Sequence, residues 1–249
     1  MEGIPFWLIL IFSVIALFYS MVGFGGGSSY LAVLVLAGLS HHEIPPVALT
    51  CNLIVAGGGF LHFYKAGHFE WRKVFPFIIL SIPMAFLGGS IKIGKDLFAL
   101  LLGLSLFAVA LRMMIPDRWF DTPRPISSKK AWGVGLPAGA LIGFFSGLVG
   151  IGGGIFLSPL LLLMRWVTVK QAAGCASFFI LVNSLSGLMG QFQKELGITN
   201  SLLPLGMAVF AGGQIGSMLG AYHISKIKLQ RILAILLLSV SVKLLWKGL

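Results

Sequence analysis

The chain has 249 residues, of which 57% are hydrophobic and only 10% are charged, and its mean hydropathy is +0.99. About a quarter of the residues of a soluble domain are charged, so this composition excludes an ordinary soluble protein. The net charge of +11 does not indicate nucleic-acid binding, because the basic residues are scattered between apolar segments. They are typical of the loop charges that set membrane topology.

The first predicted element is an apolar segment, about residues 5–39, that glycines interrupt. No Lys, Arg, Asp or Glu occurs from Gly3 to His42. As one helix this stretch would be about 60 Å long, whereas the hydrocarbon layer is about 30 Å thick. The segment must therefore turn, and residues 25–27 are the expected break because each glycine weakens a helix by about 1 kcal/mol. The chain starts without the basic region of a cleaved signal peptide, so we expect this segment to remain in the protein.

Three membrane-spanning helices are expected after each of two broken segments. A spanning helix needs roughly 20 mostly apolar residues, and the runs between the charged loops are long enough. The predicted spans are about residues 45–65, 73–92 and 96–115, then, after a second broken segment at about 131–165, residues 169–193, 199–222 and 228–246. Residues 116–130 form a polar, proline-containing linker that is too short to be a domain.

The second half of the chain repeats the first. The run Val-Gly-Phe-Gly-Gly-Gly at residues 22–27 matches Val-Gly-Ile-Gly-Gly-Gly at residues 149–154, and the features that follow occur in the same order. Many transporters are built from such a duplication. We therefore expect an all-α integral membrane protein with two repeats, residues 1–115 and 131–249, joined by the linker at 116–130.

Two topologies fit these elements. If each broken segment crosses the membrane once, the halves are parallel, and 11 Lys and Arg residues lie on one side against 7 on the other. If each broken segment is a re-entrant hairpin, the halves are inverted and the division is 13 against 5. Cytoplasmic loops carry the excess of Lys and Arg. The sequence therefore favours two inverted repeats, each a Gly-broken re-entrant helix pair plus three transmembrane helices, with both termini outside.

The glycine breaks are the first candidates for substrate binding. Their residues are Gly25, Gly26, Gly27, Gly152, Gly153 and Gly154. A helix that restarts after a break exposes free N–H groups and the positive end of its dipole, and two such ends would bind an anion without a formal charge. Ser28 and Ser29 would add hydroxyl donors at the first break only. The alternative interpretation is close helix packing through the small-xxx-small pattern.

Small polar residues on the next helix of each half complete the predicted substrate site. They are Thr50, Cys51, Asn52, Cys175, Ser177 and Asn183. They would line a polar cavity, although such residues also form hydrogen bonds between helices. No Asp or Glu lies deep in a predicted span, which argues against a cation substrate. Metal-ligand patterns and the motifs of hydrolases and ATPases are missing from the sequence. We therefore expect a small anionic substrate, a lipid bilayer around the chain, no metal or other cofactor, and no enzymatic activity.

The doubled glycine motif resembles the sulfite exporter TauE/SafE family of membrane permeases. The resemblance rests on residues 22–27 and 149–159 and on the Thr- or Ser-containing helix after each motif, and it covers nearly the whole chain. The first copy departs from the usual pattern of the family at residues 28–30, Ser-Ser-Tyr, where a larger apolar run ending in Pro is common. The resemblance implies transport of sulfite or other small sulfur-containing anions, such as organosulfonates, across a prokaryotic inner membrane.

The membrane potential favours export of an anion. An inside-negative potential contributes about 2.3 kcal/mol per charge per 100 mV, so outward movement is downhill and needs no coupling carboxylate. We expect an exporter that works by alternating access around the two glycine breaks. The alternatives are an anion channel and a non-transporting membrane subunit that anchors a partner enzyme, and the short loops argue against the second.

Overall fold

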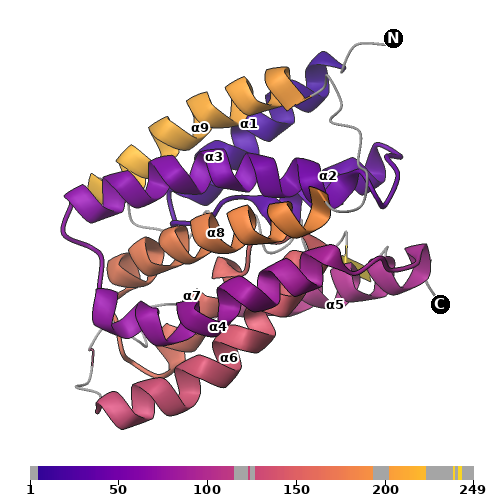
Figure 1. The fold of residues 1–249 in the computed structure, drawn as a ribbon. Helices are drawn as coiled ribbons and strands as arrows, with labels where there is room; N and C mark the ends of the chain where they lie inside the picture. The colour runs from indigo at the N-terminus through magenta and orange to yellow at the C-terminus, as the bar shows by residue number, and fades with distance from the viewer. Residues whose placement is uncertain are drawn as a thin grey trace.

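The computed structural model describes residues 5–114, 123, 127–192, 202–222, 238 and 241–242 of the chain. In this part of the chain the fold is entirely helical (Figure 1). The nine helices described are α1 (Phe6–Ser20), α2 (Gly27–Leu36), α3 (Ile44–Lys65), α4 (Trp71–Ser90), α5 (Lys95–Met114), α6 (Ser128–Val149), α7 (Gly154–Leu163), α8 (Val169–Phe192) and α9 (Leu202–Tyr222).

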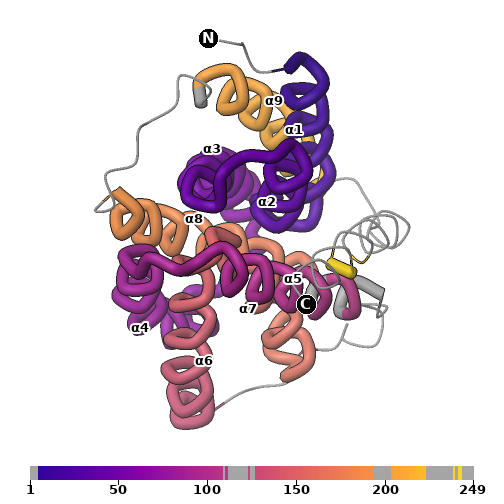
Figure 2. Tube along the Cα trace, turned by 90° about the vertical axis from the view of Figure 1, so that its right-hand side faces the viewer, coloured from indigo at the N-terminus to yellow at the C-terminus, as the bar shows by residue number. Residues whose placement is uncertain are grey.

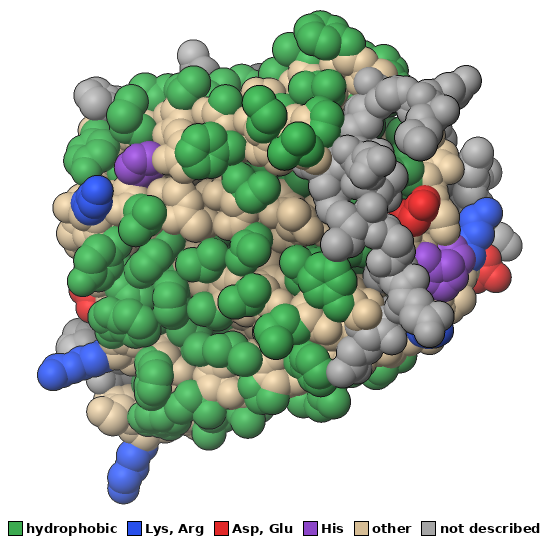
Figure 3. Space-filling model, turned by 45° about the horizontal axis from the view of Figure 1, so that its top comes forward, with side chains coloured by type: hydrophobic (Ala, Val, Ile, Leu, Met, Phe, Trp, Pro, Cys, Tyr) green, Lys and Arg blue, Asp and Glu red, His purple; other side chains and the backbone are tan. Residues whose placement is uncertain are grey.

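Five of these helices are long and apolar enough to cross a membrane, namely α3, α4, α6, α8 and α9. Four of them, all but α6, confirm predicted spans to within a few residues, and α5 lies where the span at 96–115 was expected. The predicted span at 228–246 lies almost wholly outside the described residues. Hydrophobic side chains cover the middle of the face in Figure 3, and charged side chains lie toward its two ends.

The first arm of the second broken segment is longer than that of the first. Helix α6 has 22 residues, whereas α1, its counterpart in the first half, has 15. Ser127 sets the start of α6, because its hydroxyl accepts a hydrogen bond from the Lys130 N–H at 3.4 Å. The helix ends at Gly150, which adopts a left-handed conformation with φ of 90°. This arm alone is therefore long enough to span a membrane.

Helices α3 and α8 cross antiparallel at the centre of the molecule. Gly59 near the end of α3 lies beside Ser177 in the first part of α8, and Leu49 near the start of α3 lies beside Gly187 in the last part of α8. These two helices are also the most buried of the candidate spans. The centre of the protein is therefore formed by one helix from each half.

Four further helices follow one or other of these two directions. Helix α9 runs parallel to α1, since Gly212 packs against Ser13 and Gly216 against Leu17. Contacts of α9 with α3, and of α4 with α6 and α8, are likewise in parallel register. Helices α1, α3 and α9 thus run one way, and α4, α6 and α8 run the other way (Figures 1 and 2).

The chain reverses direction at each glycine break. In the first half, the Tyr30 ring of α2 stacks on the Phe12 ring of α1, with the ring centroids 4.6 Å apart. This contact is possible only if α2 runs back toward the start of α1. In the second half, Gly154 packs against Ile180, and the Ser158 hydroxyl donates to the Ala172 carbonyl at 3.3 Å. Helix α7 is therefore antiparallel to α8 and runs opposite to α6.

Two glycine seams hold the first arm of each hairpin against a helix of the other half. In α6, glycines at positions 135, 139, 143 and 147 face the backbone of α4. In α9, glycines at positions 212, 216 and 220 face the backbone of α1. A side chain larger than hydrogen would meet a backbone atom at nearly all of these positions. The seams allow a close approach of the helix backbones, as is common in membranes.

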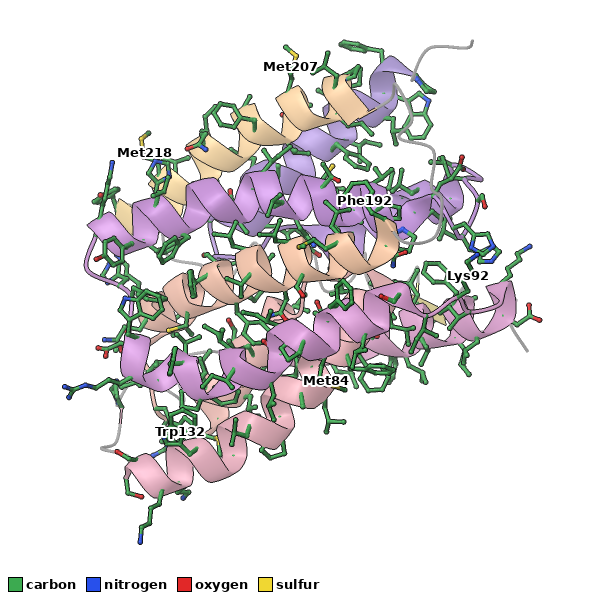
Figure 4. All side chains as sticks on the ribbon, viewed as in Figure 1. Met84, Lys92, Trp132, Phe192, Met207 and Met218 are labelled. Carbon is green, nitrogen blue, oxygen red and sulfur yellow. The ribbon has the colours of Figure 1, made fainter. Side chains whose placement is uncertain are left out.

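The charges of the described residues divide unequally between the two ends of the bundle. One end, here called the basic end, carries Lys65, Arg72, Lys73, Lys129, Lys130, Arg165 and Lys170, with Glu70. The opposite end carries Lys92 and Lys95 with Glu43 and Asp96. Figure 4 shows Lys92 at one end and Trp132, near the start of α6, at the other. This distribution is the one expected if the basic end is cytoplasmic.

Candidate substrate site

Each break is a glycine turn that leads directly into a short helix. Gly26 and Gly153 adopt left-handed conformations, with φ of 92° and 78°, and form the N-caps of α2 and α7. No side chain caps either helix start. The first N–H groups of a helix have no partner within the helix, and the helix dipole places partial positive charge there. Both breaks therefore offer uncapped hydrogen-bond donors.

The two breaks meet at the side chain of Asn52. This residue is fully buried in α3, and its Nδ2 donates to the carbonyl of Ile151 in the second break at 3.0 Å. A Cβ atom on Gly25 or Gly27 would collide with the Asn52 amide, and one on Gly152 would lie 2.8 Å from its Nδ2. Asn52 is therefore held between the two breaks, and glycine at these positions makes room for it.

Two residues of α8 complete this region. Ile180 packs against Gly25, Gly152 and Gly154, and a Cβ on Gly152 would lie 3.1 Å from the Ser184 hydroxyl. We call the region the central junction and define it by Gly25, Gly27, Asn52, Gly152, Gly154, Ile180 and Ser184. Sequence reasoning missed Ile180 and Ser184. Ser184 lies seven residues after Ser177 on the same helix face, and this spacing was the signal that could have found it.

Ser177 lies beside the first break and not within the central junction. Its hydroxyl is 3.2 Å from the carbonyl of Gly23 and 2.7 Å from the carbonyl of Ala173, one turn earlier in α8. On its other side it faces Gly59, beyond which lies Ser217 of α9. The Ser217 hydroxyl is in turn 2.7 Å from Nδ1 of His62. Small polar groups thus extend from the first break toward the basic end.

Four of the predicted site residues are not among the nearest neighbours of the break glycines. The Thr50 hydroxyl donates to the Pro46 carbonyl within its own helix at 2.8 Å. The Cys175 thiol lies 4.0 Å from the Glu70 carbonyl, close to the basic end. Asn183 donates to the Phe179 carbonyl at 2.8 Å. Cys51 is buried in the apolar core and, like these three, contacts none of the break glycines among the nearest atoms.

The surroundings of Gly26 at the first break are polar, and those of Gly153 at the second are mostly apolar. The Ser29 hydroxyl donates to the hydroxyl of Tyr19 at 2.7 Å, and the Tyr30 ring lies over Gly26. Ser28, Ser29 and both tyrosines are buried. At the second break Gly153 is surrounded instead by Phe179, Ile142 and the Cβ of Ser146. The two tyrosines were not among the predicted site residues, because a tyrosine in an apolar segment is not distinguishable from a core aromatic residue.

Several buried polar atoms around the breaks have no hydrogen-bond partner within the described part of the chain. They are the Asn52 Oδ1 and the hydroxyls of Ser28, Tyr30, Ser146 and Ser184; the Asn183 Oδ1 in α8 is unpaired as well. Buried polar groups in proteins are nearly always hydrogen-bonded, and leaving one unpaired costs about 1–3 kcal/mol. Unpaired polar atoms are therefore concentrated beside the two breaks.

The buried interior carries no formal charge where it is described. Its buried polar side chains there are all serine, asparagine or glutamine, apart from tyrosine and cysteine. No group of three or more His, Cys, Asp or Glu residues among the described positions could hold a metal ion. Recognition of an ion at the central junction would therefore depend on backbone and side-chain dipoles.

Comparison with known families decides the assignment. The family model described as Sulfite exporter TauE/SafE matches residues 8–244. The chain belongs to the sulfite exporter TauE/SafE family. This TauE/SafE protein is therefore a multi-pass membrane transporter and not an enzyme. The resemblance drawn from the doubled glycine motif is confirmed.

The relatives of this TauE/SafE protein include proteins named only as transporters. It is 37% identical to "Probable membrane transporter protein y4hK" of Sinorhizobium fredii, over 96% of this chain and 97% of that protein. It is 24% identical to "Probable membrane transporter protein YunE" of Bacillus subtilis, over 92% and 93% of the two chains. It is 27% identical to "Probable membrane transporter protein MamO" of Paramagnetospirillum magneticum, over 81% of this chain but 38% of that protein. No solved structure matches the chain.

Proposed function

We propose that the chain exports small sulfur-containing anions, such as sulfite or an organosulfonate, across a prokaryotic inner membrane by alternating access. The observation that supports this most is the meeting of two uncapped helix starts at one buried asparagine, Asn52. Paired helix N-termini near the middle of a transporter suit an anionic group. The name of the family supports sulfur as part of that group.

The proposed binding residues are those that the fold brings to the breaks. They are Gly25, Gly26, Gly27, Ser28, Ser29, Asn52, Gly152, Gly153 and Gly154, together with Ser177 and Ser184. The glycines would let the substrate approach the backbone N–H groups, and the serines would add hydroxyl donors. The positions of Thr50, Cys51, Cys175 and Asn183 favour a structural role for these four residues.

We further propose that residues 1–115 and 131–249 form inverted repeats with re-entrant hairpins, joined by residues 116–130. The antiparallel crossing of α3 and α8 supports this, because the two helices occupy the same place in their halves. So do the opposite directions of α1 and α6, and of α4 and α9. The reversal of the chain at both breaks is what a re-entrant hairpin requires.

Two groups of helices offer a basis for alternating access. One comprises α1, α2, α3 and α9, and the other comprises α4, α6, α7 and α8; each contains one hairpin and one glycine seam. The groups meet along α3 and α8, and the central junction lies at that contact, buried in the state described. Rocking of one group against the other along this contact would open the junction first toward one end and then toward the other.

Efflux from proteoliposomes tests the proposed function. Vesicles that hold the purified protein are loaded with radiolabelled sulfite, and an inside-negative potential is imposed. We expect saturable efflux that the potential drives and that empty vesicles do not show. Flux that rises without saturation would indicate a channel instead of a carrier. If sulfite, thiosulfate, sulfate and a sulfonate all fail to move, the proposed export function is wrong.

A further inference from the structure

The charge at the central junction limits the charge of its ligand. Each helix start contributes the equivalent of about half a positive charge, so α2 and α7 together offer about one. No charged side chain is buried among the described residues to add to or subtract from this. The two helix starts would neutralise a singly charged anion. A doubly charged anion would bring an excess negative charge into the membrane interior.

The orientation of the Asn52 amide adds a second constraint. Its Nδ2 donates to the Ile151 carbonyl at 3.0 Å. Turning the amide over would place Oδ1 against that carbonyl oxygen, so the hydrogen bond fixes the orientation. The Asn52 Oδ1 therefore faces the first break, where a Cβ on Gly25 would collide with it. It is fully buried and accepts no hydrogen bond from the described residues.

An unpaired acceptor beside two helix starts is unusual in a site for a bare anion. A carbonyl oxygen repels an anionic oxygen, and it is satisfied only by an N–H or O–H group. The Ser184 hydroxyl nearby is also buried without a partner, and it can donate to an anion. Together these groups suit a ligand that is anionic on one side and carries a donor on the other.

We propose that the central junction selects a singly charged oxyanion that also carries an N–H or O–H donor, with the Asn52 Oδ1 accepting from that donor. The inference rests on the proposed anion transport and narrows its substrate class. In the bound state, the starts of α2 and α7 and the Ser184 hydroxyl would contact the anionic oxygens. The donor of the ligand would lie at Asn52 between the two breaks.

Three anions of similar size can be compared in the proteoliposome assay. They test the effect of the ligand's charge separately from the effect of its hydrogen-bond donor. Sulfamate and methanesulfonate are both singly charged and nearly isosteric, but only sulfamate has N–H donors. Sulfate is doubly charged. We expect sulfamate to move faster than methanesulfonate by about ten-fold at limiting concentration, because a ligand without a donor leaves a buried acceptor unpaired. Sulfate should be the slowest of the three.

Substitutions of Asn52 test whether this residue causes the preference for sulfamate over methanesulfonate. In Asn52→Leu the ratio of sulfamate to methanesulfonate flux should fall to about one, because the acceptor is gone. Asn52→Asp keeps the shape but adds a negative charge, and it should slow both singly charged anions. Asn183→Leu is the matched control, since Asn183 is equally buried with an unpaired Oδ1 but does not face a break glycine. It should keep the wild-type ratio.

The possible outcomes separate this inference from the proposed function. A wild-type ratio near one, or a ratio that Asn52→Leu leaves unchanged, overturns the inference while anion transport stands. Sulfate flux equal to sulfamate flux overturns the single-charge requirement. If none of the three anions nor sulfite moves, the proposed function fails and the inference fails with it. The wild-type comparison needs no variant, so it decides the matter even if Asn52→Leu does not fold.

Discussion

Among the glycines that the structure describes, Gly26 and Gly153 combine a left-handed backbone conformation with an aromatic ring next to the Cβ position. Each is held at positive φ, and each has an aromatic side chain over it, Tyr30 and Phe179 respectively. A non-glycine residue in the left-handed region costs roughly 1–2 kcal/mol. Glycines elsewhere at positive φ share the first feature without the second, and this difference offers a control.

Replacing Gly26 with alanine should stop transport without unfolding the protein. The new Cβ would meet the Tyr30 ring and displace the start of α2 from the central junction. Gly38→Ala is the matched control, because Gly38 has φ of 81° but no atom within 4 Å of its Cβ position. Both variants should lose roughly 1–2 kcal/mol of stability through the left-handed backbone, and Gly26→Ala should lose more because its Cβ also meets the Tyr30 ring; thermal unfolding in detergent measures both losses. Only Gly26→Ala should lose sulfite efflux. If the efflux rate fell equally in both variants, the proposed role of this break would be contradicted.

The two cysteines should be dispensable for transport. Cys51 and Cys175 are both buried, and neither thiol faces a break glycine. We expect the Cys51→Ala and Cys175→Ala variants to keep at least half of the wild-type efflux rate, with stability lowered by about 1 kcal/mol each. N-ethylmaleimide should leave the wild-type rate unchanged over the time of an efflux assay. Rapid inactivation by this reagent would show that a thiol reaches the transport path.

At the level of helices, the glycine seam between α4 and α6 should determine stability more than function. A Cβ on Gly143 would collide with the backbone of Ser81, so Gly143→Ala must force the two helices apart. We expect a loss of about 1–3 kcal/mol. Gly133 lies in the same helix with open space around it, and Gly133→Ala should not lower stability. Thermal unfolding of both variants in detergent makes the comparison, and equal behaviour would argue against a tight seam.

The order of the helices was predictable from the sequence, because it depends on local composition. Charge-free runs fixed the spans, and glycine triplets marked the breaks. The seam between α4 and α6 was not predictable, because the glycines at positions 135, 139, 143 and 147 show their role only in their contacts with α4. Seam glycines and break glycines are the same residue type, and only tertiary contacts distinguish them.

The candidate site was predictable in part for the same reason. The break glycines and Asn52 stand out as small or polar residues in apolar surroundings. Ile180 does not, because nothing local separates it from the other apolar residues of α8. Its place at the breaks depends on the crossing of α3 and α8, which contact each other across more than 100 residues of sequence. Such pairings are set by the whole fold.

At the scale of the whole molecule, each half completes the packing of the other. The hairpin arm α1 packs along α9, and the arm α6 packs along α4. The central junction takes one break from each half and lies between α3 and α8. In the proposed inverted arrangement, the described loops of both halves place Lys and Arg at the basic end, so the two ends of the molecule differ in charge.

The orientation of these two ends in the membrane is a final prediction. The basic end should be cytoplasmic, because loops rich in Lys and Arg remain inside. Lys129, at the start of α6, lies at the basic end, and Lys95, at the start of α5, lies at the opposite end; both are exposed. In intact cells, a membrane-impermeant maleimide should label the Lys95→Cys variant and leave the Lys129→Cys variant unlabelled until the cells are opened. The native cysteines are buried and should contribute little background. Labelling of Lys129→Cys from outside would contradict the predicted orientation and place the basic end on the outer side of the membrane.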